Sequence, residues 1–110
     1  MLPPTPDLAA RQVIVAAYCY YVLDNPVMDD GEYDKLSVVA ADNWSELHKD
    51  RQWALGDPES TRAGGSHIKF SMRAVCAAHD KLERMGRTAK PFEHRWRRAK
   101  GIGRYVTALA

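Results

Sequence analysis

Apolar residues recur at helical spacing in the first part of the chain. The first run predicts a helix that begins near Leu8 and is capped by Asp7. The run is too long and too rich in alanine for a strand. It stops at Asp24-Asn25-Pro26, because a proline disfavours helical geometry in the residue before it. We therefore expect one helix that closes with a turn.

A second helix is predicted to start at Asp29 or Asp30 and to end near Asp42. Acidic residues crowd its first turn, where the helix dipole favours negative charge. An inward stripe of apolar positions follows the helical period: Tyr33, Leu36, Val39 and Ala40. A short helical piece over residues 44–53 and a loop over residues 56–66 complete this half.

The third long helix is predicted from Met72 to Met85, with Gly86 as its stop. Its apolar side contains positions at helical spacing: Met72, Val75, Cys76, His79, Leu82 and Met85. Pro91 suits the first turn of a fourth helix, which is expected to run through Ala99.

The end of the chain has a break at Gly101-Ile102-Gly103, followed by an apolar stretch over residues 105–110. No segment predicts a strand, so the expected fold class is all-α. The expected organisation is a disordered lead-in over residues 1–6, a helical domain over residues 7–66, and a basic helical extension over residues 67–110. The extension is expected to pack on the domain or to follow it. A chain of 110 residues suits one small domain.

Charge is distributed unevenly between the two halves of the chain. Residues 1–60 contain four Lys/Arg and eleven Asp/Glu, whereas residues 61–110 contain twelve and three. This asymmetry suggests two surfaces with different partners. The alternative is that the two halves attract each other within one fold.

The sequence gives no sign of export or of membrane insertion. The longest uncharged apolar run, Val13 to Leu23, is about half the length of a membrane-spanning helix. A secretory signal pattern is missing. Cys19 and Cys76 belong to no CxxC pair and are expected to be free thiols. These features favour a cytoplasmic protein.

One group of residues points to a ligand. Tyr20 and Tyr21 end the first predicted helix, and Asp30, Tyr33 and Asp34 share one face at the start of the second. Aromatic faces attract cations and flat heterocycles, and carboxylates accept hydrogen bonds from ribose hydroxyls. A pyridinium ring attached to ribose would suit such a patch. The alternative is that the tyrosines belong to the core and the acids only begin a helix.

The same residues carry a resemblance to a known family. The order of tyrosines, acids and proline resembles the signature of the Ia domain, which binds nicotinamide mononucleotide (NMN), of bacterial NAD-dependent DNA ligases. The matching positions are Tyr20, Tyr21, Asp24, Pro26, Asp30, Glu32, Tyr33 and Asp34. Downstream, Ser45-Glu46-Leu47 resembles the family's Pro-Glu-Leu, and residues 57–64 resemble its loop ending in Thr-Gln-Arg-Val-Gly. The resemblance covers about residues 8–66.

The resemblance implies a role for each matched residue. Tyr20 and Tyr33 would pack on or near the nicotinamide ring of NMN or NAD. Asp30 and Asp34 would bind the ribose or phosphate side. Tyr21 occupies a position that is histidine or tyrosine in the family. Of the remaining positions, Asp24 and Pro26 would shape the turn, and Arg62 would belong to a closing loop.

The chain departs from the ligases in what it lacks. The family's nucleotidyl-transfer lysine lies in a Lys-x-Asp-Gly motif, and the nearest string here, Lys100-Gly101-Ile102-Gly103, has no aspartate. No P-loop or GxGxxG motif is present either. We expect a stand-alone Ia-like protein in DNA repair or replication that binds NMN or NAD and does not ligate by itself.

The basic half suggests other partners. Clustered arginines and lysines neutralise phosphates, and aromatic residues among them can stack on bases. The residues expected to contact nucleic acid or a protein partner are Arg95, Trp96, Arg97, Arg98, Lys100 and Arg104. The alternatives are a bacteriophage-type protein that modulates a host system, a partner of a ligase catalytic chain, and a plainly solvated charged helix. No metal site is predicted, since Cys76 and His79 lack a second pair of ligands.

Overall fold

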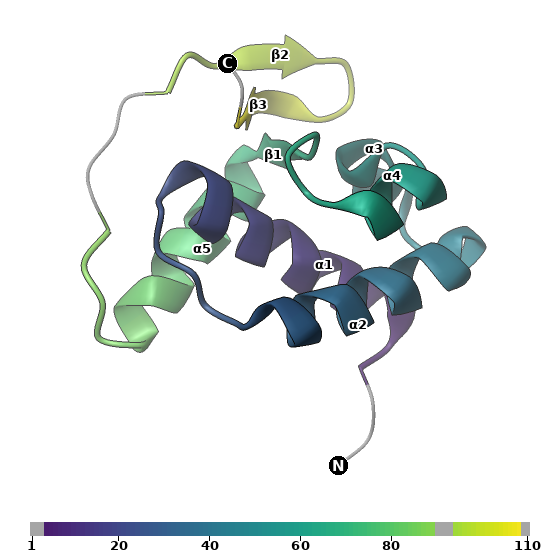
Figure 1. Cartoon of the computed structure of the whole chain (residues 1–110). Coiled ribbons are helices and arrows are strands. Elements are labelled where there is room, and N and C mark those ends of the chain that lie inside the picture. Colours follow the sequence, from purple (N-terminus) through teal and green to yellow (C-terminus); the bar gives the residue numbers. More distant parts are fainter. Residues whose placement is uncertain (1–3, 90–93, 109–110) are drawn as a thin grey trace.

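A computed structural model describes residues 4–89 and 94–108 as a mostly helical protein with a small sheet (Figure 1). The α-helices in these residues are α1 (Pro6–Ala17), α2 (Asp30–Asp42), α3 (Lys49–Leu55), α4 (Pro58–Ala63) and α5 (Met72–Arg84). A π-helical turn, Tyr18–Val22, extends α1, and a 3-10 turn, Trp44–Glu46, precedes α3. The strands are β1 (Lys69–Ser71), β2 (Arg97–Ala99) and β3 (Gly103–Thr107).

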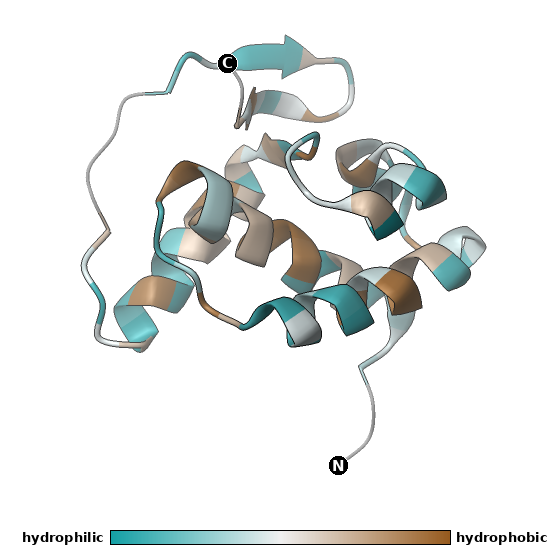
Figure 2. Cartoon of the chain, in the orientation of Figure 1, coloured by the Kyte–Doolittle hydropathy of each residue, from teal (hydrophilic) through white to brown (hydrophobic). Residues whose placement is uncertain are grey.

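Helix α1 lies at the centre and contacts α2, α3 and α5. Its buried positions are mostly small, and Ala9, Ala10 and Ala17 are fully inaccessible to solvent. Small side chains let neighbouring helices approach closely, and the burial of the larger Val13 and Ile14 supplies the hydrophobic stabilisation. Much of α1 is accordingly hydrophobic, whereas β2 is hydrophilic (Figure 2).

The helix starts are set by side-chain caps. Asp29 accepts a hydrogen bond from the Glu32 amide at 2.8 Å, so α2 begins and ends where the sequence predicts. The predicted cap of α1 was wrong, because Thr5 and not Asp7 accepts from the first turn. Asp7 instead accepts from the backbone N–H of His48 at 2.9 Å, which ties α1 to the start of α3.

Helix α4 lies in the segment that the sequence predicts to be a loop. Asp57 accepts hydrogen bonds from the backbone and the hydroxyl of Ser60, and Pro58 occupies the first turn. The same residues that punctuate loops thus begin a helix of only six residues. A helix this short depends on its caps and its tertiary packing.

The mostly helical architecture confirms the expected fold class in part, and the sequence missed a small sheet of three strands. They form an antiparallel sheet in the order β1-β3-β2, with Phe70 opposite Val106 and Arg98 opposite Arg104. The predicted fourth helix is wrong over Arg97–Ala99, which is β2, and its first residues lie outside the described ranges. The predicted last apolar stretch begins within β3. Gly101 and Gly103 adopt positive φ angles of 81° and 91°, which favours glycine in the hairpin turn.

The sheet packs onto the helices through one face. Phe70 and Val106 are buried, and their side chains join the same core as α1 and α5. The segment after residue 66 therefore contributes to the core that covers α1. Within the described residues, no helix combines the length and apolarity needed to cross a membrane.

Tyr18 connects the helices to the C-terminal segment. Its ring is fully buried and packs edge-on against Phe70, with the ring centroids 5.3 Å apart. Its hydroxyl lies 2.6 Å from Nε2 of His94 and 3.5 Å from Nε2 of His79. Burial raises the pKa of Tyr18 to about 12, so the hydroxyl stays protonated and shares a hydrogen bond with the His94 ring nitrogen.

The contact between Tyr18 and His94 predicts a stability that depends on pH. Burial, with His79 as a second cause, lowers the pKa of His94. In the unfolded chain, His94 takes up a proton near pH 6.5, whereas in the folded chain it does so only at lower pH. Just below pH 6.5 the unfolded chain therefore binds more protons than the folded chain. We therefore expect the urea midpoint to fall as the pH drops below about 6.5.

His94→Gln should weaken this pH dependence. Urea unfolding of the two proteins between about pH 5 and 8 measures the effect. Equal pH dependence in the wild type and His94→Gln would contradict the role given to the buried imidazole.

Candidate functional site

The five residues predicted to bind a nucleotide line one cavity of about 310 Å³. The cavity lies between the π-helical turn, the first turns of α2 and the end of α4. Its lining residues are Ala16, Tyr20, Tyr21, Pro26, Val27, Met28, Asp30, Tyr33, Asp34 and Gly64. The structure therefore brings together every member of the predicted Tyr/Asp group.

The two adjacent tyrosines face outward because of the π-helical turn that carries them. Tyr18 and Cys19 are fully buried, whereas Tyr20 is 53% exposed and Tyr21 is 40% exposed. Their rings contact each other edge to face, with centroids 4.8 Å apart. Single π-helical turns occur often at functional sites. Such exposed aromatic rings are available to a ligand, unlike tyrosines that belong to the core.

Tyr33 closes the inner end of the cavity. Its hydroxyl is buried and makes no hydrogen bond of normal geometry with the described residues; Ser37 Oγ, one turn along α2, interacts with it only weakly and is itself buried without such a bond. Burial raises the pKa of Tyr33 to about 12, with Tyr21 as the next cause. An unpaired buried hydroxyl costs free energy, so this group is available to a ligand that can pair with it.

Gly65 allows this placement of the tyrosines. A Cβ atom at this position would lie 2.3 Å from the Tyr33 hydroxyl oxygen and 3.0 Å from Cε2 of Tyr21. Any side chain at residue 65 would therefore displace both rings. The sequence identifies Gly64 and Gly65 only as loop punctuation, since a contact with Tyr33 cannot be seen in local sequence.

The electrostatics of the cavity are acidic. Asp30 and Asp34 are exposed and stand one helical turn apart, a spacing at which like charges repel. No lysine or arginine is present among the described lining residues. A cation placed between these carboxylates would relieve their repulsion, so the site is suited to a positively charged group.

The turn before α2 is held from a distant part of the chain. The Arg87 guanidinium donates to Oδ1 of Asn25 at 3.2 Å and to the backbone carbonyl of Pro26. Arg87 follows α5, so the basic half of the chain supports one wall of the cavity. Arg62, which the resemblance assigns to a closing loop, lies on α4 and forms an ion pair with Asp42 at 2.7 Å.

The predicted nucleic-acid contacts lie on and beside the β2–β3 hairpin. Five of these side chains are exposed: Arg95, Arg97, Arg98, Lys100 and Arg104. Trp96 is half-buried, with its ring 5.2 Å from that of His94 and 5.7 Å from the Arg104 guanidinium. The residues form an extended basic edge in place of the expected charged helix.

Gly65→Ala should destabilise the protein by about 1–3 kcal/mol, because the added methyl group overpacks the Tyr33 hydroxyl. Gly31→Ala is the matched control. Gly31 lies in the first turn of α2, and its new methyl group would lie 3.3 Å from Oδ1 of Asp29, the oxygen that caps the helix. That variant should stay within about 1 kcal/mol of the wild type, because the gain of alanine over glycine in a helix offsets the crowding of the cap. Thermal unfolding compares the two, and a neutral Gly65→Ala would contradict the described packing.

Comparisons with protein-family models, with curated proteins and with solved structures find no match for this chain. Residues 4–89 and 94–108 contain no group of three or more His, Cys, Asp or Glu side chains that could hold a metal ion. The resemblance to the ligase Ia domain therefore stays a prediction, and the geometry of the cavity is the main support for a function.

Proposed function

We propose that this protein binds the nicotinamide riboside end of NMN or NAD in the cavity formed by Tyr20, Tyr21, Asp30, Tyr33 and Asp34. The observation that carries the proposal is the convergence of these residues on one cavity. They come from two segments separated by a turn. The resemblance to the ligase Ia domain selects the same residues independently of the geometry.

The chemistry of the cavity fits an oxidised nicotinamide ring. The ring carries a positive charge, which the faces of Tyr20 and Tyr21 attract. Asp30 and Asp34 are placed to accept hydrogen bonds from ribose hydroxyls, as acidic residues do in dinucleotide sites. The unpaired Tyr33 hydroxyl is a donor or acceptor for the carboxamide.

The size and charge of the cavity limit how much of a dinucleotide it holds. A volume of about 310 Å³ is at the small end of ligand pockets. The nearby carboxylates repel a phosphate. In our proposal the riboside occupies the cavity and the phosphate points to solvent. The protein acts as a binding protein in a DNA-metabolism setting and does not ligate DNA alone.

Oxidised and reduced NMN provide a sharp test, because they share the same phosphate and differ in the charge of the ring. We expect titration calorimetry to detect binding of NMN and a roughly tenfold weaker binding of the reduced form, since a partly desolvated cation–π contact is worth about 1–2 kcal/mol. Nicotinamide riboside, which has no phosphate, should bind about as well as NMN. Absence of heat with both NMN and the riboside would end the proposal.

Asp34→Asn should weaken NMN binding by roughly tenfold, because it removes a charge-assisted acceptor. Glu32→Gln is the control, since it removes a carboxylate from the same exposed turn but does not line the cavity. Equal affinity of the two variants would show that the acidic pair has no role in binding.

Tyr33→Phe separates function from stability. Removal of the unpaired hydroxyl should raise the stability of the free protein by about 1 kcal/mol, because a buried group without a partner is lost. The same change should weaken NMN binding. A variant that is less stable than the wild type, or that binds NMN equally well, would contradict the role given to this hydroxyl.

A second candidate function is contact with nucleic acid or an acidic host protein through the basic hairpin. The specific observation is that Arg98 lies directly opposite Arg104. Like charges at such paired positions destabilise a sheet, and an anionic partner would relieve the repulsion. The expected result is DNA retention that falls steeply with salt and is lost when Arg95, Arg97 and Arg98 become glutamine. Retention that does not change with salt would argue against it.

A further inference from the structure

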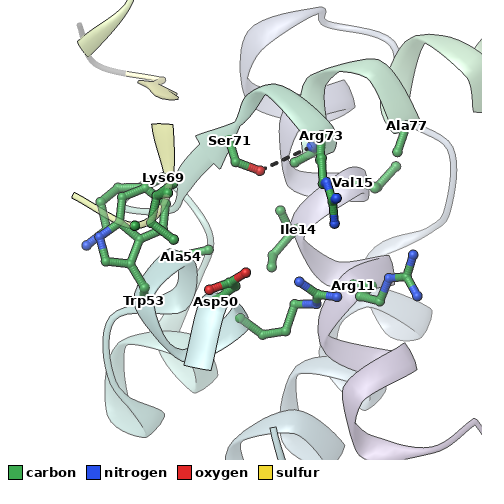
Figure 3. A pocket seen from close by; sticks show the side chains of 14 residues that line it. Arg11, Ile14, Val15, Asp50, Trp53, Ala54, Lys69, Ser71, Arg73 and Ala77 are labelled. Atoms are coloured by element: carbon green, nitrogen blue, oxygen red, sulfur yellow. Dashed lines mark hydrogen bonds between the residues drawn. The ribbon is translucent and has the colours of Figure 1, made fainter. Parts of the chain in front are cut away.

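A second cavity, of about 370 Å³, lies on another side of α1 (Figure 3). Arg11, Ile14 and Val15 share one face of this helix and line the second cavity. Ala16, which lines the first cavity, lies on a different face. The other walls come from α3, β1, the start of α5 and the turn of the β2–β3 hairpin. The cavity thus forms where the helices meet the sheet.

The lining of this cavity is strongly basic. Four cationic side chains, from four different elements, surround it together with one carboxylate: Arg11, Arg51, Lys69, Arg73 and Asp50. Figure 3 shows Arg73 and Asp50 reaching into the space from opposite sides, with Ile14 between them. Like charges gathered in a concave space repel each other, and an anion would offset that repulsion.

Most of these cations are not neutralised within the protein. Arg11, Lys69 and Arg73 form no ion pair with any residue in the described ranges. Arg51 Nε lies 3.7 Å from an Asp7 carboxylate oxygen, too far for a hydrogen bond. This nitrogen is buried and has no hydrogen-bond acceptor among the described residues. Asp7 therefore neutralises Arg51 only weakly, and the charge of Arg51 adds to that of the three cations without an ion pair.

The beginning of α5 lies at the same cavity. Ser71 caps this helix by accepting from the Ala74 amide at 3.3 Å, and Ser71, Arg73 and Ala74 all line the cavity. The other amides of the first turn have no partner within the helix, and the helix dipole is positive at this end. These features reinforce the charge of the side chains.

An aromatic wall completes the cavity. The Trp53 ring is covered by the Lys69 ammonium at 4.6 Å from its centroid. Tyr105 of β3 packs edge-on against the same ring, with the centroids 5.0 Å apart and the planes at 90°. Trp53 is therefore fixed beside the cations by contacts from the sheet. Its indole group reports on any ligand that enters.

We propose that this second cavity binds a phosphate group, carried by a mononucleotide or by a nucleic-acid strand. A phosphate offers several oxygens to donors that arrive from different directions, and arginine forks match that geometry. Helix starts are common phosphate sites for the same reason. The site is separate from the nicotinamide cavity, and it does not depend on the function proposed for that cavity.

The test begins with inorganic phosphate, which contains no pyridine ring. We expect it to shift the Trp53 indole N–H signal in a nitrogen-edited NMR spectrum of the whole protein at low salt, with saturation. The signal is assigned with Trp53→Phe. Inorganic phosphate lacks the nicotinamide group, so a negative result with phosphate does not bear on NMN binding in the first cavity. A negative result with NMN and the riboside likewise does not bear on the phosphate site. A Trp53 signal that does not move at any phosphate concentration would overturn the proposal.

Two variants show whether the effect comes from this cavity. Arg11→Gln combined with Arg73→Gln should weaken the shift by roughly tenfold or more. Lys35→Gln, an exposed cation of α2 outside the cavity, should change it less than about twofold, as expected for a remote screened charge. Ala77→Glu adds a carboxylate at the exposed rim and keeps all four cations, so it provides a second way to block binding. Wild-type affinity in both blocking variants would overturn the proposal.

Two further ligands identify the source of the phosphate. Adenosine 5′-monophosphate that binds more tightly than inorganic phosphate, with little gain from a longer strand, would identify a mononucleotide site. A short oligodeoxythymidylate that binds more tightly still, with a steep salt dependence, would identify a strand. Failure of both ligands to shift Trp53 would overturn the proposal even if inorganic phosphate shifts it.

Discussion

The burial of Tyr18 at the end of α1 holds the helices and the C-terminal segment together. Its ring is packed against Phe70 of β1, and its hydroxyl contacts His94 of the C-terminal segment. One side chain therefore connects the first helix, the sheet and the residues that lead to the hairpin. Because the π-helical turn begins at this anchored residue, the next two tyrosines are turned outward into the first cavity.

The two cavities lie on different faces of α1 and have opposite charge. The first contains Asp30 and Asp34 beside exposed aromatic rings, and the second contains four cations beside Trp53. The first also includes the buried Tyr33 hydroxyl, which lacks a hydrogen bond of normal geometry among the described residues, and in the second Asp7 pairs only weakly with Arg51. In both cases a ligand of the right charge would offset groups that the protein leaves poorly paired. This opposite charge does not follow the two halves of the sequence, since Arg11 and Arg51 of the second cavity belong to the acidic half.

The long helices could be predicted from the sequence because their signals are local. Asp29 caps α2 and Gly86 follows α5 at a φ of 72°, as the pattern of polar and glycine positions indicates. The Tyr/Asp group of the first cavity was likewise visible, since its members lie on either side of one turn. Here the sequence alone was sufficient to name the lining tyrosines and acids.

The sheet and the second cavity could not be predicted in the same way. Phe70 of β1 pairs with Val106 of β3, which is far away in the sequence. The two strands have only three and five residues, so neither is long enough to show a periodic pattern in the sequence. Arg11, Arg51 and Arg73 come from three helices, so only the packing of those helices brings them together. The contact of Gly65 with Tyr33 is also a tertiary property, and no local rule identifies it.

The proposed function requires a nicotinamide ring to lie against the tyrosines of the first cavity, and intermolecular nuclear Overhauser effects measure that contact without any substitution. In a complex with NMN, we predict contacts from the pyridine ring protons to the ring protons of Tyr20 and Tyr33. Contacts only with residues of the hairpin or of the second cavity, or their complete absence at saturating NMN, would contradict the proposed function.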